Sequence, residues 1–215
     1  MILYKGRRDT IEVFENINAF LDDNPEEVVV INVQISVGNP TPTELWNEMV
    51  SAGIKKKVYK YDGGEWPTLQ TLINDDKRLL AFHHNGPDCS VTSSGCHARI
   101  PPFFDYAHET NWSFDSKNDL NNYSISCPAT RGNSGTKEYY SINHFITEFY
   151  GPSPNQAPEV NSKESLENKL AGCKQQTGDD ANFLNIDFWH KGDLLEVTHG
   201  ENKYRHYQAS SRRLL

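Results

Sequence analysis

Polar side chains of kinds that take part in catalysis recur at the ends of four short, otherwise apolar stretches. These stretches are EVVVINVQ, RLLAFHH, YYSINHF and NFLNIDF, and each has the composition and length of a strand. Because alternate residues of a strand share a face, each stretch has one apolar face and one face that becomes polar near its C-terminal end. Histidine transfers protons near neutral pH, and carboxylates and amides orient it and bind polar substrates. The residues on the polar faces are Asn32, Gln34, His83, Asn143, Asn185 and Asp187.

Helical patterns alternate with these strands. Residues 9–23 place apolar side chains on one helical stripe, and Thr41 with Glu44 forms a capping box before TELWNEMVSA, which ends at Gly53. Strands that alternate with helices predict an α/β fold with a parallel sheet. No glycine-rich turn follows a strand, so the fingerprint of a nucleotide-binding doubly wound fold is absent. A closed barrel is the competing arrangement.

In a parallel α/β barrel, the active site forms at the C-terminal ends of the strands. We therefore expect Gln34, His83, Asn143 and Asp187 to point into one concavity, with His84 packed or exposed instead. The opposite faces should pack against helices, and they include Leu184 and Ile186.

The second half of the chain has a less regular pattern. Residues 111–138 and 150–160 are rich in polar residues or proline and predict loops. Asn161 with Glu164 predicts the start of a helix, and Gly172 predicts its end.

Composition excludes several classes of protein. The chain has 215 residues with a net charge of −8, and its 10 tyrosines, 10 phenylalanines and 4 tryptophans can form a core. Disordered chains lack such large side chains, so this composition argues against disorder. It has no apolar run long enough to span a membrane. Its acidic balance argues against nucleic acid or an anionic membrane surface as a partner.

The cysteines and two sequons bear on the compartment. None of the four cysteines lies in a CxxC pair, which argues against a zinc knuckle, and their even number permits two disulfides. Asn111 and Asn122 begin N-glycosylation sequons. Together these features favour secretion, although the first residues, MILYKGRRDT, contain no apolar signal-peptide core.

An ordered series of stretches carries a family resemblance over residues 7–202. They are FLDDNPEEVVVINVQ, WPTLQTLINDDKRLLAF, FDYAHETNWSF, CPATRG, INHF and ANFLNIDFWHKGDLLEV. The chain resembles the phosphatidylinositol-specific phospholipase C–like phosphodiesterases, in their secreted fungal and plant-type branch. The resemblance implies a (β/α) TIM-type barrel over residues 1–202, followed by a peripheral tail, residues 203–215. It also implies a role in lipid metabolism, the hydrolysis of a phosphodiester in a phospholipid or glycosyl-phosphoinositide.

The resemblance also implies roles for single residues. Asp187 matches the aspartate that orients a catalytic histidine, and His83 is the inward-facing histidine by strand alternation. Glu109 and Arg131 match recurrent family positions, where Arg131 either holds a phosphate oxygen or forms a surface ion pair. Gln34 stands where many members have a carboxylate, so calcium or another divalent cation lacks support, and no other cofactor is expected. The residues expected to bind the substrate are Asn32, Gln34, Glu109, Arg131 and Asn143.

The acid and base histidines of the family lie at the ends of its first two strands and match no residue of this sequence. Because MILYKGR resembles the segment just after the second histidine, the resemblance predicts an incomplete barrel without those two strands. It further predicts little turnover by this chain alone and self-association through an open sheet edge. The alternative is a non-catalytic remnant or binding module. An unrelated serine or cysteine hydrolase is disfavoured because no G-x-S-x-G elbow occurs.

The positions of the four cysteines predict two disulfides. Cys127 and Cys173 flank matching stretches on neighbouring connections, and Cys89 and Cys96 bound a short loop. We predict the bridges Cys127–Cys173 and Cys89–Cys96.

Overall fold

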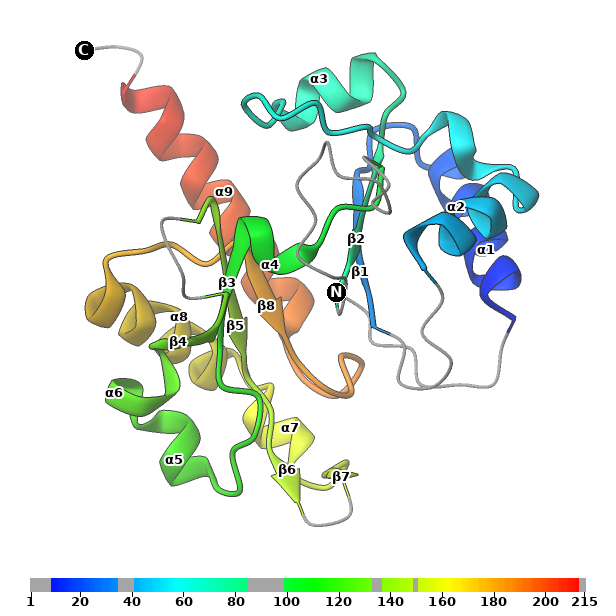
Figure 1. Cartoon of the computed structure of the whole chain (residues 1–215). Helices are drawn as coiled ribbons and strands as arrows, with labels where there is room; N and C mark the ends of the chain where they lie inside the picture. The colour runs from blue at the N-terminus through cyan, green and yellow to red at the C-terminus, as the bar shows by residue number, and fades with distance from the viewer. Residues whose placement is uncertain (1–8, 35–40, 85–98, 133–136, 149–150, 213–215) are drawn as a thin grey trace. The chain divides into compact units, whose positions relative to one another are not determined.

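A computed structural model describes residues 9–34, 41–84, 99–132, 137–148 and 151–212, without the side chains of residues 206–212. The chain forms two compact units, which meet in the sequence between Tyr106 and Ala107 (Figure 1). Helices and strands occur in both units, so the predicted mixed α/β class is confirmed. The strands of the described residues form one four-stranded and two two-stranded sheets, none closed into a barrel. The barrel itself stays a prediction.

The first unit is built on two parallel strands, β1 (Val29–Val33) and β2 (Leu79–His83). The capping box of Thr41 and Glu44 is confirmed, and Gly53 has the positive φ of 76° expected after a helix. The helical elements of this unit are α1 (Thr10–Asp23), α2 (Pro42–Ser51), the 3₁₀ turn η1 (Ile54–Lys56), α3 (Leu69–Asn74) and α4 (Phe103–Tyr106).

The core of the first unit lies between this strand pair and the helices. Val29, Ile31 and Val33 of β1 pack with Leu79 and Ala81 of β2 against helix residues. The helix residues buried there include Phe14, Leu21, Leu45 and Met49. The predicted apolar face of β1 is therefore confirmed.

The second unit contains a four-stranded sheet with the order β4-β3-β5-β8 (Figure 1). The three parallel strands are β3 (Ala107–Thr110), β5 (Tyr139–Asn143) and β8 (Phe183–Asn185), and β4 (Ala129–Arg131) runs antiparallel to β3. The other elements are α5 (Lys117–Asn121), α6 (Tyr123–Ser126), the hairpin β6 (Thr147–Glu148) and β7 (Gly151–Pro152), α7 (Ala157–Val160), α8 (Lys163–Thr177) and α9 (Leu194–Arg212). The predicted boundary of the tail at residue 202 falls within α9.

Two segments predicted as loops contain short elements. Helices α5 and α6 and strand β4 lie within residues 111–138, and β7 and α7 lie within residues 150–160. These elements span only two to five residues each, too few for hydrophobic periodicity to reveal.

Alternation along β5 and β8 is confirmed in the second unit. Tyr140 and Ile142 pack with the cysteine pair, and Leu184 lies beside the same cluster. Ile186 packs with Leu166 of α8 and Val197 of α9. One face of the sheet is therefore covered by helices, as the sequence predicts.

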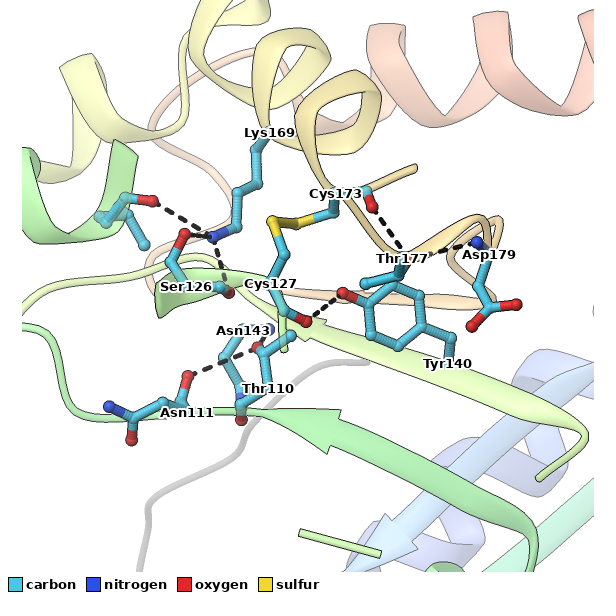
Figure 2. Close-up of a disulfide and its surroundings, with 11 residues drawn as sticks. Thr110, Asn111, Ser126, Cys127, Tyr140, Asn143, Lys169, Cys173, Thr177 and Asp179 are labelled. Atoms are coloured by element: carbon cyan, nitrogen blue, oxygen red, sulfur yellow. Dashed lines mark hydrogen bonds between the residues drawn. A yellow bond between two sulfur atoms is a disulfide. The ribbon is translucent and has the colours of Figure 1, made fainter. Parts of the chain in front are cut away.

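The predicted Cys127–Cys173 disulfide is confirmed, and both cysteines are fully buried (Figure 2). It joins the end of α6 to α8 across a separation of 46 residues. The predicted partner pair, Cys89 and Cys96, lies outside the described residues.

Both predicted ends of helix α8 are wrong. Ser162, rather than Asn161, is the N-cap, and its hydroxyl accepts a hydrogen bond from the backbone N–H of Ser165. The helix continues past Gly172 to Thr177, and Gly178 with φ of 84° follows it. Gly172 is instead a packing residue, because a Cβ there would lie 2.3 Å from the ring of Tyr123.

Candidate functional site

Four buried polar residues share the sheet face opposite to the helices of the second unit. Strand register places Glu109 beside Ser141 and Asn143 beside Asn185. All four side chains are buried. Three parallel strands thus bring polar groups together near their C-terminal ends, the arrangement that the sequence predicts for Asn143 and Asn185.

Hydrogen bonds connect these residues into a network. The Nδ2 of Asn185 donates to Ser141 Oγ at 2.9 Å and to Asn143 Oδ1 at 3.0 Å. The Nδ2 of Asn143 donates to the carbonyl of Thr110 at 3.0 Å, while Thr110 Oγ1 accepts from the backbone N–H of Asn143 at 2.9 Å (Figure 2). The Oδ1 of Asn185 accepts no hydrogen bond within the described part of the chain. The network therefore leaves one buried acceptor, the Oδ1 of Asn185.

An ion pair between Glu109 of β3 and Arg131 of β4 borders the network. The Glu109 side chain is 3% exposed, whereas that of Arg131 is 32% exposed. Burial raises the pKa of Glu109, and the nearby Arg131 charge opposes this rise. A partly exposed arginine side chain that is paired with a carboxylate can also bind a phosphate oxygen.

Asp187 lies just beyond the end of β8 and is half-buried. Its carbonyl accepts a hydrogen bond of 2.8 Å from Asn161 Nδ2. It lines a small pocket with Ile146, Val160 and Phe188. Its expected role, the orientation of an imidazole, stays a prediction.

The first unit holds the other predicted site residues, and the facing of His83 differs from the prediction. Register pairs Val33 with His83, so His83 shares the helix-covered face of β2. His84 is instead the histidine beside Asn32, with 2.9 Å between Asn32 Nδ2 and His84 Nδ1. Every residue of β2 is buried, so alternation of polarity could not show which face meets the helices. Gln34 is exposed after the end of β1.

The convergence of all predicted site residues stays a prediction, because they belong to different units. Asn32, Gln34 and His83 lie in the first unit, whereas Asn143 and Asp187 lie in the second.

Sequence reasoning missed two buried ionisable residues, His144 and Lys169. His144 is fully buried, and its Nε2 lies 2.9 Å from the carbonyl of Val160 and 3.0 Å from Ser165 Oγ. Burial, together with the charge of Lys169, lowers the pKa of His144 to about 4. Strand alternation is the one sequence signal that could have placed His144. It follows Tyr140 and Ile142 at a spacing of two residues, and these three residues face the helices.

Lys169 of α8 is also fully buried, in a helix whose composition is strongly polar. Its Nζ donates to the carbonyls of Leu120 and Ser126, at 3.2 and 3.0 Å, and to Ser126 Oγ at 2.5 Å (Figure 2). Burial lowers the pKa of Lys169 to about 7. The ammonium group ties the ends of α5 and α6 to α8, and no sequence pattern indicates this.

The two sequon asparagines differ in exposure. Asn122 is exposed, and its Oδ1 accepts a hydrogen bond from Ser124 Oγ at 2.7 Å. Asn111 is half-buried and exchanges hydrogen bonds of 3.2 Å with the backbone of Ser113. Glycosylation at either residue stays a prediction.

Two searches bear on metals and membranes. Among the described residues, no group of three or more histidine, cysteine, aspartate or glutamate side chains is placed to hold a metal ion. Within the same ranges, no helix has the length and apolar character needed to cross a membrane.

Comparison with known proteins identifies the family. The family model described as PI-PLC X matches residues 5–202. The chain belongs to the PI-PLC X family. It is 26% identical over 199 residues to PI-PLC X domain-containing protein 1 of Arthroderma benhamiae, which covers 85% of this chain. The chain spans 61% of the length of that relative. No solved structure matches the chain significantly.

Proposed function

We propose that this protein is a phosphodiesterase domain of lipid metabolism, which acts on an inositol-type head group in a phospholipid or a glycosyl-phosphoinositide. The observation that carries the proposal is the PI-PLC X match over nearly the whole chain. The buried polar face of the second unit supports it, because Glu109 and Arg131, which the resemblance had singled out, are paired there.

The residues of this face have distinct proposed roles. Arg131 binds a phosphate oxygen, and Glu109 holds the guanidinium in place. Asn143 and Asn185 contact hydroxyl groups of the head group, for which amides offer both donors and acceptors. Asp187 fixes the tautomer of a catalytic imidazole and stabilises its charged form.

Proton transfer needs an acid and a base besides these groups. The resemblance assigns both roles to two histidines that match no residue of this sequence, so we expect the 215-residue chain to bind the head group with turnover near background. We propose that Asn32 and Gln34 contact the substrate, with His84 beside Asn32, whereas the helix-covered face of His83 does not fit the catalytic role expected for it.

We also propose that the protein works outside the cell. The buried Cys127–Cys173 disulfide is compatible with an oxidising compartment, and the Asn122 sequon is exposed. Treatment of the protein secreted from its own cells with an N-glycosidase should reduce its mass.

The decisive experiment measures binding of inositol 1-phosphate by calorimetry or NMR. Arg131→Met should weaken binding by about tenfold or more, since charge-assisted hydrogen bonds are lost. Lys174→Met is the matched control, because this exposed cation pairs with Asp180 on the same unit.

Turnover of phosphatidylinositol vesicles is measured in parallel. Binding without turnover agrees with the expectation for this chain, whereas turnover that Asp187→Asn abolishes would establish the activity and contradict our account of the histidines. The absence of any binding that depends on Arg131 would refute the proposed function.

A further inference from the structure

Asn161 connects three parts of the second unit, although the sequence suggested only a helix cap. It lies between α7 and α8 and is 1% exposed. Its backbone N–H donates to the carbonyl of Ala157 at 2.8 Å, which ends α7. Its side-chain Nδ2 donates to the carbonyls of Asp187 and Phe188 at 2.8 and 3.4 Å. The side chain therefore holds the chain where it leaves β8.

The backbone of Asn161 holds the other end of the loop that connects β8 to α9. Its carbonyl accepts a hydrogen bond of 2.8 Å from the N–H of Asp193, whose Oδ2 accepts from the N–H of Lys163 at 2.9 Å. Gly192 has a φ of 132°, and a Cβ there would lie 2.4 Å from the carbonyl oxygen of Asn161. The close contact therefore requires glycine at position 192.

The loop between these two anchors contains a residue in an uncommon conformation. Phe188 has a φ of 52°, which is costly for an aromatic residue, and its carbonyl accepts from the N–H of Lys191 at 2.7 Å. Such a conformation persists only where its surroundings enforce it. Asn161 supplies that enforcement directly beside Asp187.

We propose that Asn161 is a positioning residue that fixes the carboxylate of Asp187 by holding the backbone on its C-terminal side. The role of Asp187 in this inference rests on the proposed function, whereas the placement of Asp187 by Asn161 does not. The Oδ1 of Asn161 is buried and accepts no hydrogen bond within the described residues, so the loop depends on the donor half of the amide. A carboxylate at position 161 would face two carbonyl oxygens and repel the loop.

The test compares Asn161→Asp with the wild-type chain by NMR. We expect amide exchange at Lys191 and Asp193 to rise by about tenfold to a hundredfold, as the loss of a buried hydrogen bond implies, while exchange within α8 stays unchanged. The carboxyl-carbon resonance of Asp187, assigned with Asp187→Asn, should titrate at a different pH in the variant. Because the new carboxylate of Asn161→Asp itself acts on Asp187, the change must recur in Gly192→Ala, which adds no charge.

Two further variants keep the test decisive. Gly192→Ala should release the same loop from its other end if Asn161→Asp fails to fold, and Asn168→Asp places the same charge on an exposed position of α8 as a control. An unchanged Asp187 titration in Gly192→Ala, which frees the loop without adding a charge, would overturn the inference. If the wild-type chain does not bind inositol 1-phosphate, the proposed function fails instead. The two failures are therefore distinguishable.

Discussion

Strand β5 places polar groups on both of its faces, and the two sets have different surroundings. On the helix side, Tyr140 and Ile142 pack with the buried disulfide, and His144 lies against α8, where the charge of Lys169 acts on it. On the opposite side, Ser141 and Asn143 belong to the network that ends at Glu109 and Arg131.

The polar groups on the helix side mostly contact backbone carbonyls. The hydroxyl of Tyr140 donates to the carbonyl of Cys127 at 2.6 Å, and Lys169 donates to two carbonyls and one hydroxyl (Figure 2). In the described part of the chain, Lys169 forms no ion pair with a carboxylate. The opposite face instead has Arg131, which is paired with Glu109 and has a partly exposed side chain. We infer that the helix side holds the unit together and that the other side binds ligand.

This difference can be tested by substitutions on the helix side, which should reduce stability and leave inositol 1-phosphate binding within about twofold. Arg131→Met should instead weaken binding by about tenfold or more, and it should also reduce stability because the buried Glu109 carboxylate loses its partner. A helix-side variant that stays folded but loses binding would break the distinction.

Removal of the disulfide should have the largest effect. The double variant Cys127→Ala with Cys173→Ala frees a loop of 46 residues, which implies a loss of about 4 kcal/mol in the free energy of unfolding. Urea unfolding of the variant beside the oxidised wild type measures this loss. A loss below about 1 kcal/mol would show that packing around Gly172 holds α6 to α8 without the bridge.

His144 should make the protein sensitive to acid. Because its pKa falls from 6.5 to about 4 on folding, the unfolded state binds more protons between these values, and stability falls as the pH drops through that window. The full effect is on the order of 3 kcal/mol. His144→Gln keeps a donor for the Val160 carbonyl but does not titrate, so its unfolding free energy should change less from pH 6.5 to pH 4. Equal acid sensitivity in both proteins would contradict this assignment.

Lys169 should give a smaller effect, on the alkaline side. Its pKa falls from 10.5 to about 7 on folding, so the unfolded state binds more protons in this window and stability rises with pH across it. The three oxygen acceptors favour the charged amine and so counteract the effect of burial on the pKa. We therefore expect the free energy of unfolding to rise by only about 1–2 kcal/mol across this window. Lys169→Met should remove the rise, as thermal unfolding between pH 7 and pH 10 would show. The exposed Lys174→Met provides the control.

Local patterns predicted several features of the fold. Helix α1, the capping box of α2 and the two faces of β5 follow from residue spacing, because each depends on neighbours along the chain. The family resemblance supplied the Cys127–Cys173 pairing and pointed to Glu109 and Arg131.

Features that depend on distant contacts were not predictable. The face of His83 depends on which side of a strand buried on both faces meets the helices. Lys169 lies in a polar helix and is buried because α5 and α6 end against it, about 45 residues earlier in the chain. Asn161 had the residue type of a helix cap, and its contacts with Asp187 come from a loop 26 residues later.

Gly172 links the packing of α6 against α8 to the chemistry of the disulfide. The ring of Tyr123 occupies the space that any side chain at position 172 would need, so the helices approach closely only with glycine there. Cys173 is the next residue of α8, and Cys127 follows α6 directly. Among homologous sequences, glycine at this position and the two cysteines should therefore be retained or lost together as one inherited unit.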